Sequence, residues 1–168
     1  VVVHHEPGTT RDAIDTYLTF RDRTVCLIDT AGLRRQSRVD DDVEFYSRLR
    51  ASSAIRRADV CLLMVDSAQG ASNQDFRIGE QAWDEGCGLV FVANKWDLVE
   101  DRGPDVVADF AEALRERAAY LRRVPILTAS ALTGQRVRKG LELALEVQEN
   151  RRRRIPTAEV NEVLQELL

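Results

Sequence analysis

Paired cysteines, a signal peptide and an apolar segment long enough to cross a membrane are all missing from this sequence. Its 168 residues include three cysteines, Cys26, Cys61 and Cys87, which lie far apart and lack the close pairing that zinc or iron–sulfur sites need. We therefore expect reduced, buried thiols. Because no apolar run approaches the ~18 residues of a membrane span, we expect a soluble, cytoplasmic protein with no membrane partner.

An excess of basic charge is also missing. The formal net charge is −4, which argues against a dedicated nucleic-acid binder. The exception is the run Arg151–Arg154, for which local contact with RNA and a solvated helix end that complements the helix dipole are equal alternatives. The first position holds Val1 instead of methionine, so we expect that a part of the natural chain precedes it.

What is present is the material of one α/β domain. The 44% of hydrophobic residues suffices for a real core in a chain of this length. Apolar runs typical of strands lie at about residues 13–20, 24–28, 60–65, 89–93 and 125–128. Helical spacing is found at about residues 43–57, 74–85, 106–121 and 136–153. This alternation predicts a mostly parallel sheet with helices on both faces, except that the short "RDR" between the first two strands demands an antiparallel hairpin.

Two motifs near the start have the chemistry of a phosphate sensor. "DTAG" follows the second strand: Asp29 could hold a magnesium ion through its water shell, and Gly32 lets a backbone N–H approach a terminal phosphate. "EPGTTRD" contains Thr10, whose hydroxyl could ligate magnesium in a loop that orders around the phosphate. Each motif alone is also compatible with an ordinary solvated turn.

Two further motifs follow later strands and have the chemistry of a guanine reader. In "NKWD", the carboxylate of Asp97 could accept from the ring N–H and the exocyclic amine of guanine. Asn94 would fix the loop, and the stem of Lys95 would lie over the base. In "TASALTGQ", the small residues Ser130 and Ala131 would let backbone N–H groups reach the guanine carbonyl. Four such motifs in this order, each at a strand end, favour guanine-nucleotide recognition.

These motifs resemble a known family. "PGTTRDAIDT", "LIDTAGLRR", "NKWDLV" and "SALTGQRV" are similar to the second GTPase domain of the Der (EngA) ribosome-assembly GTPases. TrmE-type tRNA-modification GTPases share "PGTTRD" and "DTAG", but "NKWD" followed by "SALTGQRV" favours Der. The resemblance implies a Ras-like, P-loop-NTPase-type G domain over residues 1–154, and the start of a KH-like domain over residues 155–168.

The resemblance also implies a nucleotide site and partners. The implied GTP-binding residues are Thr10, Asp29, Thr30, Ala31, Gly32, Leu33, Asn94, Lys95, Trp96, Asp97, Ser130, Ala131 and Leu132. Thr10 and Asp29 would bind magnesium. Leu33 stands where Ras-type GTPases have a water-orienting glutamine, so a backbone group, a potassium ion or the ribosome would have to assist a slow hydrolysis. The implied partners are the large ribosomal subunit, its RNA, a tandem G domain and the KH-like domain.

One indispensable motif is missing: no "GxxxxGK[ST]" phosphate loop occurs in the sequence, and the nearest phrase, Gly134–Gly140, lies in a helical pattern. In the family this loop follows a central strand, so we expect two half-sheets and a chain that alone is poorly stable, binds GTP weakly and is inactive. The parent protein would be a GTPase that switches during large-subunit assembly. The alternatives are a non-catalytic interaction module that keeps the G-domain architecture, or a TrmE-type GTPase.

Overall fold

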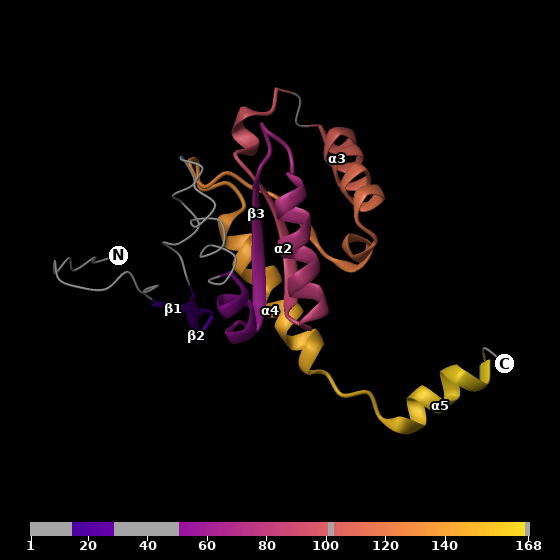
Figure 1. Ribbon diagram of the computed structural model, residues 1–168. Helices are drawn as coiled ribbons and strands as arrows, with labels where there is room; N and C mark the ends of the chain where they lie inside the picture. The colour runs from indigo at the N-terminus through magenta and orange to yellow at the C-terminus, as the bar shows by residue number, and fades with distance from the viewer. Residues whose placement is uncertain (1–14, 29–50, 101–102, 167–168) are drawn as a thin grey trace. The chain divides into compact units, whose positions relative to one another are not determined.

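A computed structural model of the chain describes residues 15–28, 51–100 and 103–166 (Figure 1). The chain divides into two compact units, residues 1–58 and 59–168. The described strands form two separate sheets, of two strands in the first unit and three in the second. This agrees with the two half-sheets expected for a G domain without its first strand.

The first unit contains the predicted hairpin. Strands β1 (Thr16–Phe20) and β2 (Arg23–Leu27) pair antiparallel. Arg21 and Asp22 join them with φ angles of 49° and 59°, the pattern of a two-residue type I′ turn that matches the twist of the flanking strands. Residues 51–57 are helical, and the rest of the helix predicted over 43–57 lies outside the described residues.

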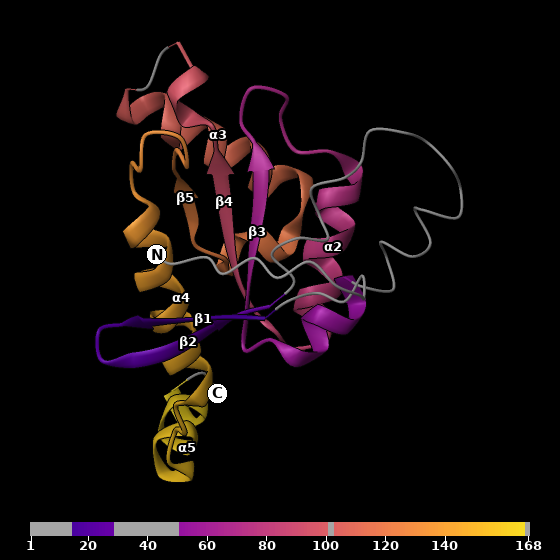
Figure 2. The same ribbon diagram turned by 90° about the vertical axis from the view of Figure 1, so that its left-hand side faces the viewer.

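The second unit is a parallel sheet of three strands in the order β3 (Val60–Asp66), β4 (Gly88–Asn94) and β5 (Ile126–Thr128). Figure 2 shows β3, β4 and β5 side by side. The helices that connect and follow the strands are α2 (Asn73–Asp84), α3 (Pro104–Arg117), α4 (Val137–Arg152) and α5 (Thr157–Glu166). Helix α4 covers one face of the sheet and α2 and α3 the other (Figure 1), which confirms the predicted α/β layering.

The core is built around β4, whose residues from Gly88 to Ala93 are all buried. Val90 and Val92 pack with Leu143 and Val147 of α4, while Phe91 is completely buried. Gly88 is required at the start of the strand because a Cβ there would lie 2.8 Å from Cγ1 of Val147. A strand buried on both faces reads in the sequence as a continuous apolar run, which is why "GLVFVA" was recognisable.

The third predicted helix ends earlier than its spacing suggested. Helix α3 stops at Arg117, Ala118 is extended with φ −145°, and the 3₁₀ helix η3 (Ala119–Arg123) follows. Because of this break, the Leu121 side chain is completely buried in the core. The Tyr120 hydroxyl also donates a hydrogen bond to the carbonyl of Phe76 in α2, at 3.1 Å. Tertiary contacts have overridden a local helical preference here.

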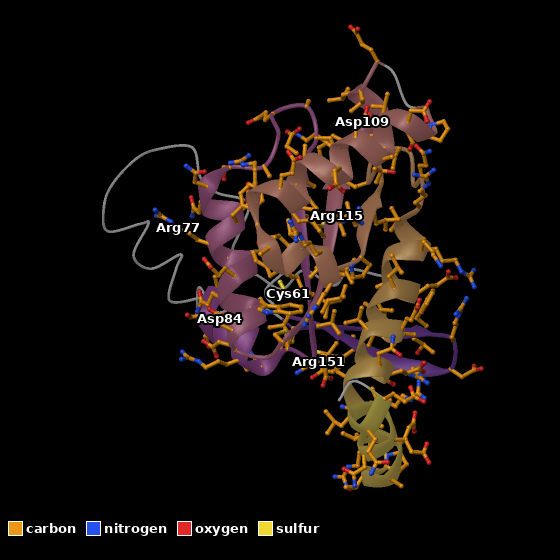
Figure 3. The ribbon with its side chains drawn as sticks, turned by 90° about the vertical axis from the view of Figure 1, so that its right-hand side faces the viewer. Cys61, Arg77, Asp84, Asp109, Arg115 and Arg151 are labelled. Atoms are coloured by element: carbon orange, nitrogen blue, oxygen red, sulfur yellow. The ribbon has the colours of Figure 1, made fainter. Side chains whose placement is uncertain are left out.

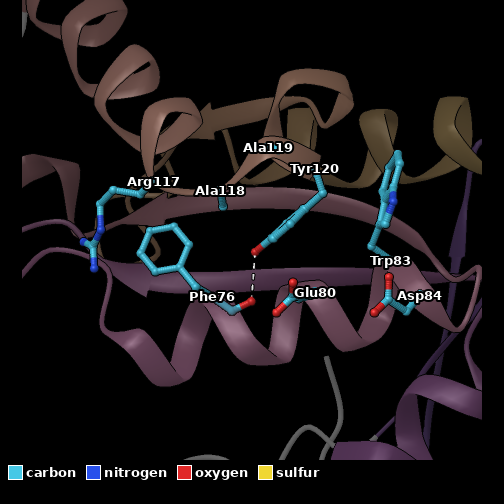
Figure 4. Close-up of a pocket in the computed structure, with 8 residues that line it drawn as sticks. All are labelled: Phe76, Glu80, Trp83, Asp84, Arg117, Ala118, Ala119 and Tyr120. Atoms are coloured by element: carbon cyan, nitrogen blue, oxygen red, sulfur yellow. Dashed lines mark hydrogen bonds between the residues drawn. The ribbon is translucent and has the colours of Figure 1, made fainter.

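A shallow pocket of about 270 Å³ lies between α2 and the α3–η3 segment (Figure 4). Its lining residues are Phe76, Glu80, Trp83, Asp84, Arg117, Ala118, Ala119 and Tyr120. None of them is a predicted nucleotide-binding residue, and Arg117 is already engaged by the Ala71 carbonyl and Asn73 Oδ1. This pocket is therefore separate from the candidate site.

The half-buried Cys61 (Figure 3) and the buried Cys87 lie in the second unit. Cys26 is half-buried in the first unit. All three thiols are free, and only Cys87 is fully buried, whereas burial was predicted for all three. Burial, and secondarily the neighbouring Cys87, raises the pKa of Cys61 to about 12. This thiol therefore stays protonated and poorly nucleophilic at neutral pH.

The described part of the chain has neither a membrane-spanning helix nor a metal-binding cluster. Among the described residues, no helix is long and apolar enough to cross a membrane. The same residues contain no group of three or more histidine, cysteine or acidic side chains arranged to hold a metal ion. The predicted magnesium residues, Thr10 and Asp29, fall outside the described part of the chain.

Half of the arginine run fastens α4 to the sheet. Arg151 donates from Nη1 to the carbonyl of Asp59 at 2.5 Å and from Nη2 to the carbonyl of Gly86 (Figure 3). Arg152 donates to the Asp59 carboxylate at 3.2 Å. These guanidinium groups therefore form a clasp: they bind Asp59 just before β3 and Gly86 in the turn after α2. Neither of the two predicted roles, RNA contact or a solvated helix end, included this one.

We expect Arg151→Ala to lower the free energy of unfolding by about 1 kcal/mol or slightly more, because two carbonyls lose a charged donor at once. Arg154→Ala is the matched control: Arg154 is exposed, and its loss should stay within about 0.5 kcal/mol. Urea denaturation followed by circular dichroism compares the two. Equal destabilisation by both variants would show that the clasp contributes nothing specific.

Candidate functional site

The carboxyl ends of the three parallel strands bring the later motifs together. Asn94 ends β4 and pairs in register with Asp66 at the end of β3, while Ala93 pairs with Thr128 at the end of β5. The "NKWD" and "SAL" loops therefore leave neighbouring strands at the same edge of the sheet. This edge is where parallel α/β folds bind their ligands.

Three hydrogen bonds tie the two loops to each other. The side-chain oxygen Oδ1 of Asn94 accepts from the backbone N–H of Ala131 at 2.9 Å. The N–H of Trp96 donates to the carbonyl of Ala129 at 3.0 Å, and the N–H of Ala129 donates to Ala93 at 2.9 Å. The Asn94 side chain thus joins the "NKWD" loop to the "SAL" loop, and its role at a guanine site stays a prediction.

Trp96 is the anchor of the first loop. Its side chain is 3% exposed and packs edge-on against Phe110 of α3, with ring centroids 5.4 Å apart. Immediately before it, Lys95 takes a left-handed conformation with φ 61°, and the short 3₁₀ helix η2 (Trp96–Leu98) follows. Because its indole is buried in the core, Trp96 contributes to the site by fixing the position of its loop.

Asp97 lies within η2 and has an unusual carboxylate. Among the residues that the structure describes, its Oδ1 atom is buried and has no hydrogen-bond partner. A buried acceptor left unpaired costs on the order of 1–3 kcal/mol, so such atoms call for an explanation. One explanation is that Asp97 Oδ1 accepts a hydrogen bond from a donor on a ligand.

The second loop is more tightly closed than the sequence suggested. Ser130 is completely buried, its N–H donates to the carbonyl of Gln135 at 3.0 Å, and its Oγ accepts from the N–H of Thr133 at 3.1 Å. With the N–H of Ala131 bound to Asn94, two amides expected to face a guanine carbonyl are engaged within the protein. Leu132, at the tip of the loop, is 86% exposed.

Asp66 is a functional candidate that the motif search missed. Its Oδ2 atom lies 2.5 Å from Nζ of Lys95. The hydrogen bond from Lys95 holds the pKa of Asp66 below its ordinary value, although partial burial opposes this shift. The carboxylate is therefore ionised at neutral pH. Its position at the end of β3, next to the motif-bearing edge, was the signal that could have pointed to it.

The predicted phosphate-sensing residues cannot be placed. Thr10, together with Asp29, Thr30, Ala31, Gly32 and Leu33, lies outside the described residues. The described residues therefore include only those predicted to recognise the base, and these lie within residues 59–168.

Comparison with known families decides what kind of domain this is. The family model of the elongation factor Tu GTP binding domain matches residues 3–150. The chain belongs to this family. Its members are the class of domain that the motif order predicted, so the predicted G-domain fold is confirmed.

Named relatives sharpen this assignment. The chain is 52% identical over all its 168 residues to GTPase Der of Gemmatimonas aurantiaca, and 46% identical over 168 residues to GTPase Der of Caldanaerobacter subterraneus subsp. tengcongensis. The resemblance to Der seen in the motifs is thereby confirmed. The chain spans 38% of the length of each of these two relatives.

Solved structures share the fold at lower sequence identity. A structure of Era in complex with MgGDPNP and nucleotides 1506–1542 of 16S ribosomal RNA is 20% identical with a TM-score of 0.66, over 87% of this chain and 47% of that one. Translation elongation factor SelB from Methanococcus maripaludis, with the GTP analogue GppNHp, is 18% identical with a TM-score of 0.63, over 84% of this chain and 29% of that one. At these identities the likeness concerns the fold.

The two tryptophans test the anchoring role of Trp96. We expect Trp96→Ala to destabilise the chain by about 3–5 kcal/mol, because a fully packed indole is removed from under the "NKWD" loop. Trp83→Ala is the control, since Trp83 is 38% exposed and should cost less than half as much. Chemical denaturation measures both. Similar losses from the two substitutions would contradict the assignment of Trp96 as the anchor.

Proposed function

We propose that this chain is the guanine-recognising part of a GTPase that switches during assembly of the large ribosomal subunit. The observation that carries the guanine assignment is the buried, unpartnered Oδ1 atom of Asp97 in a loop fixed by Asn94 and Trp96. Guanine offers a ring N–H and an exocyclic amine as adjacent donors to one carboxylate. Adenine lacks that pair, so it would leave the acceptor unsatisfied.

The other contacts to the base follow from which groups remain available. The stem of Lys95 would lie over the ring, as its left-handed backbone sets its direction. Because the amides of Ser130 and Ala131 are engaged, the exposed Leu132 is the residue of the "SAL" loop whose N–H we propose for the guanine carbonyl. This assignment narrows the predicted backbone contact from Ser130, Ala131 and Leu132 to Leu132 alone.

The phosphate half is proposed from the sequence. Thr10 and Asp29 would bind Mg²⁺, and residues 29–33 would sense the terminal phosphate. Leu33 cannot polarise water, so we propose slow intrinsic hydrolysis that a backbone group, a potassium ion or the ribosome assists. The missing "GxxxxGK[ST]" loop would come from another part of the parent polypeptide, and the 168-residue chain alone would bind GTP weakly.

The C-terminal helix supports the proposed domain boundary. Residues 1–154 would form the truncated G domain, and residues 155–168 would open a KH-like domain. Helix α5 has no buried residue, and it exposes Val160, Val163 and Leu164 at helical spacing. An apolar face of this kind needs a covering element. We propose that the remainder of the KH-like domain covers it.

The proposed partners follow from the resemblance to the Der family: the large ribosomal subunit and its RNA, and a tandem G domain and a KH-like domain of the same cytoplasmic protein. Of the arginine run, Arg153 and Arg154 are the candidates for RNA contact, since Arg151 and Arg152 fasten α4 to Asp59 and Gly86.

Asp97→Asn tests the proposed base recognition in the full-length product of the gene. An asparagine amide can donate where the carboxylate accepted, so the variant should lose about tenfold to a hundredfold in GDP affinity and gain affinity for XDP, which has a carbonyl in place of the exocyclic amine. Calorimetric titration with GDP, XDP and ADP measures the preference.

The matched control is Asp105→Asn, which alters an exposed carboxylate in the first turn of α3. It should leave the GDP-to-XDP preference unchanged. Unaltered base preference in Asp97→Asn, or wild-type protein that binds ADP as tightly as GDP, would contradict the proposed function.

A further inference from the structure

The loop that follows β3 is hydrogen-bonded to the first residue of the "NKWD" loop. Ser67 donates to the carbonyl of Asn94 twice, from its N–H at 2.9 Å and from its Oγ at 2.6 Å. This contact continues the β3–β4 ladder by one residue beyond the register pair of Asp66 and Asn94. The two loops are therefore joined to each other at Asn94, the first residue of "NKWD".

The carboxylate of Asp66 is held in place by its own loop. Its Oδ1 atom accepts from the N–H of Ala68 at 2.9 Å, and its Oδ2 atom accepts from Nε2 of Gln69 at 3.2 Å. The turn is closed by the N–H groups of Gln69 and Gly70, which both donate to the Asp66 carbonyl. Gly70 sits at φ +76°, a conformation that favours glycine. Asp66 is thus a fixed negative charge.

Lys95 forms an ion pair with the Asp66 carboxylate. Its side chain is 52% exposed, and a lysine stem with four rotatable carbons samples many rotamers unless its ammonium is held. Nζ lies 2.5 Å from Oδ2 of Asp66, which fixes the far end of the stem, while the left-handed backbone at φ 61° fixes the near end. Both ends of the stem are therefore defined before any base is bound.

We propose that Asp66 is a positioning residue of the guanine site: by holding the Lys95 ammonium, it keeps the lysine stem extended over the place of the base. This inference rests on the proposed function and adds a residue to it. The benefit to binding is entropic, because the rotamers of Lys95 are restricted in the free protein instead of on binding.

The test uses the full-length gene product and GDP carrying a fluorescent ribose substituent. Asp66→Asn keeps the shape and the acceptor for Ala68 but removes the charge. It should weaken GDP binding by about twofold to fivefold, through faster dissociation, as expected for the loss of one partly exposed ion pair. Asp109→Asn on α3 (Figure 3) is the control and should bind as the wild type does.

A double-mutant cycle separates positioning from general weakening. Lys95→Ala should remove the benefit, so adding Asp66→Asn to it should cost nothing more. Because Lys95 does not read the exocyclic amine, Asp66→Asn should weaken GDP and IDP by the same factor, unlike a change at Asp97. If Asp66→Asn fails to fold, Lys95→Gln, which keeps most of the stem and loses the charge, should show the same loss.

Wild-type GDP affinity in Asp66→Asn or in Lys95→Gln, or additive losses in the cycle, would overturn the positioning role while leaving the proposed function intact. A wild-type protein that does not bind GDP would overturn both.

Discussion

The burial of strand β4 is the constraint on which the rest of the structure depends. The strand is hydrogen-bonded to β3 on one side and β5 on the other, and it is covered by helices on both faces, so its position is fixed by contacts in every direction. Where its apolar run ends, Asn94 emerges at a defined point and orientation. The positions of the two loops follow from where β4 ends. The Asn94 side chain accepts a hydrogen bond from the N–H of Ala131, and the N–H of Trp96 donates to the carbonyl of Ala129.

The site places polar groups at some cost to stability. Asp97 keeps a buried acceptor unpaired, which disfavours folding by on the order of 1–3 kcal/mol. Lys95 adopts a left-handed backbone that few non-glycine residues adopt. These local costs are offset by the buried indole of Trp96, by the hydrogen bond from the Trp96 backbone N–H to Ala129, and by the hydrogen bond that the Asn94 side chain accepts from Ala131. The loops of the proposed base-recognition site are therefore held by contacts within the protein, without a ligand.

Much of this architecture could be predicted because its residues act locally. The three parallel strands were predicted from their apolar runs, and the motifs "NKWD" and "SAL" lie at the ends of two of them. Other features depend on contacts distant in sequence. The break after Arg117 is set by Tyr120 and Leu121 meeting the core, and the engagement of the Ser130 amide depends on Gln135. Asp66 escaped notice because its partner lies 29 residues away.

In this structure the proposed base-recognition site is assembled without nucleotide. Hydrogen–deuterium exchange of the nucleotide-free, full-length protein, resolved at single amides, tests it most directly. The N–H groups of Trp96, Ala129 and Ala131 should exchange at least about a hundredfold more slowly than in an unstructured peptide, because each is bonded within the site. Exchange of these amides at the unstructured rate, with protection appearing only after GDP is added, would contradict the account.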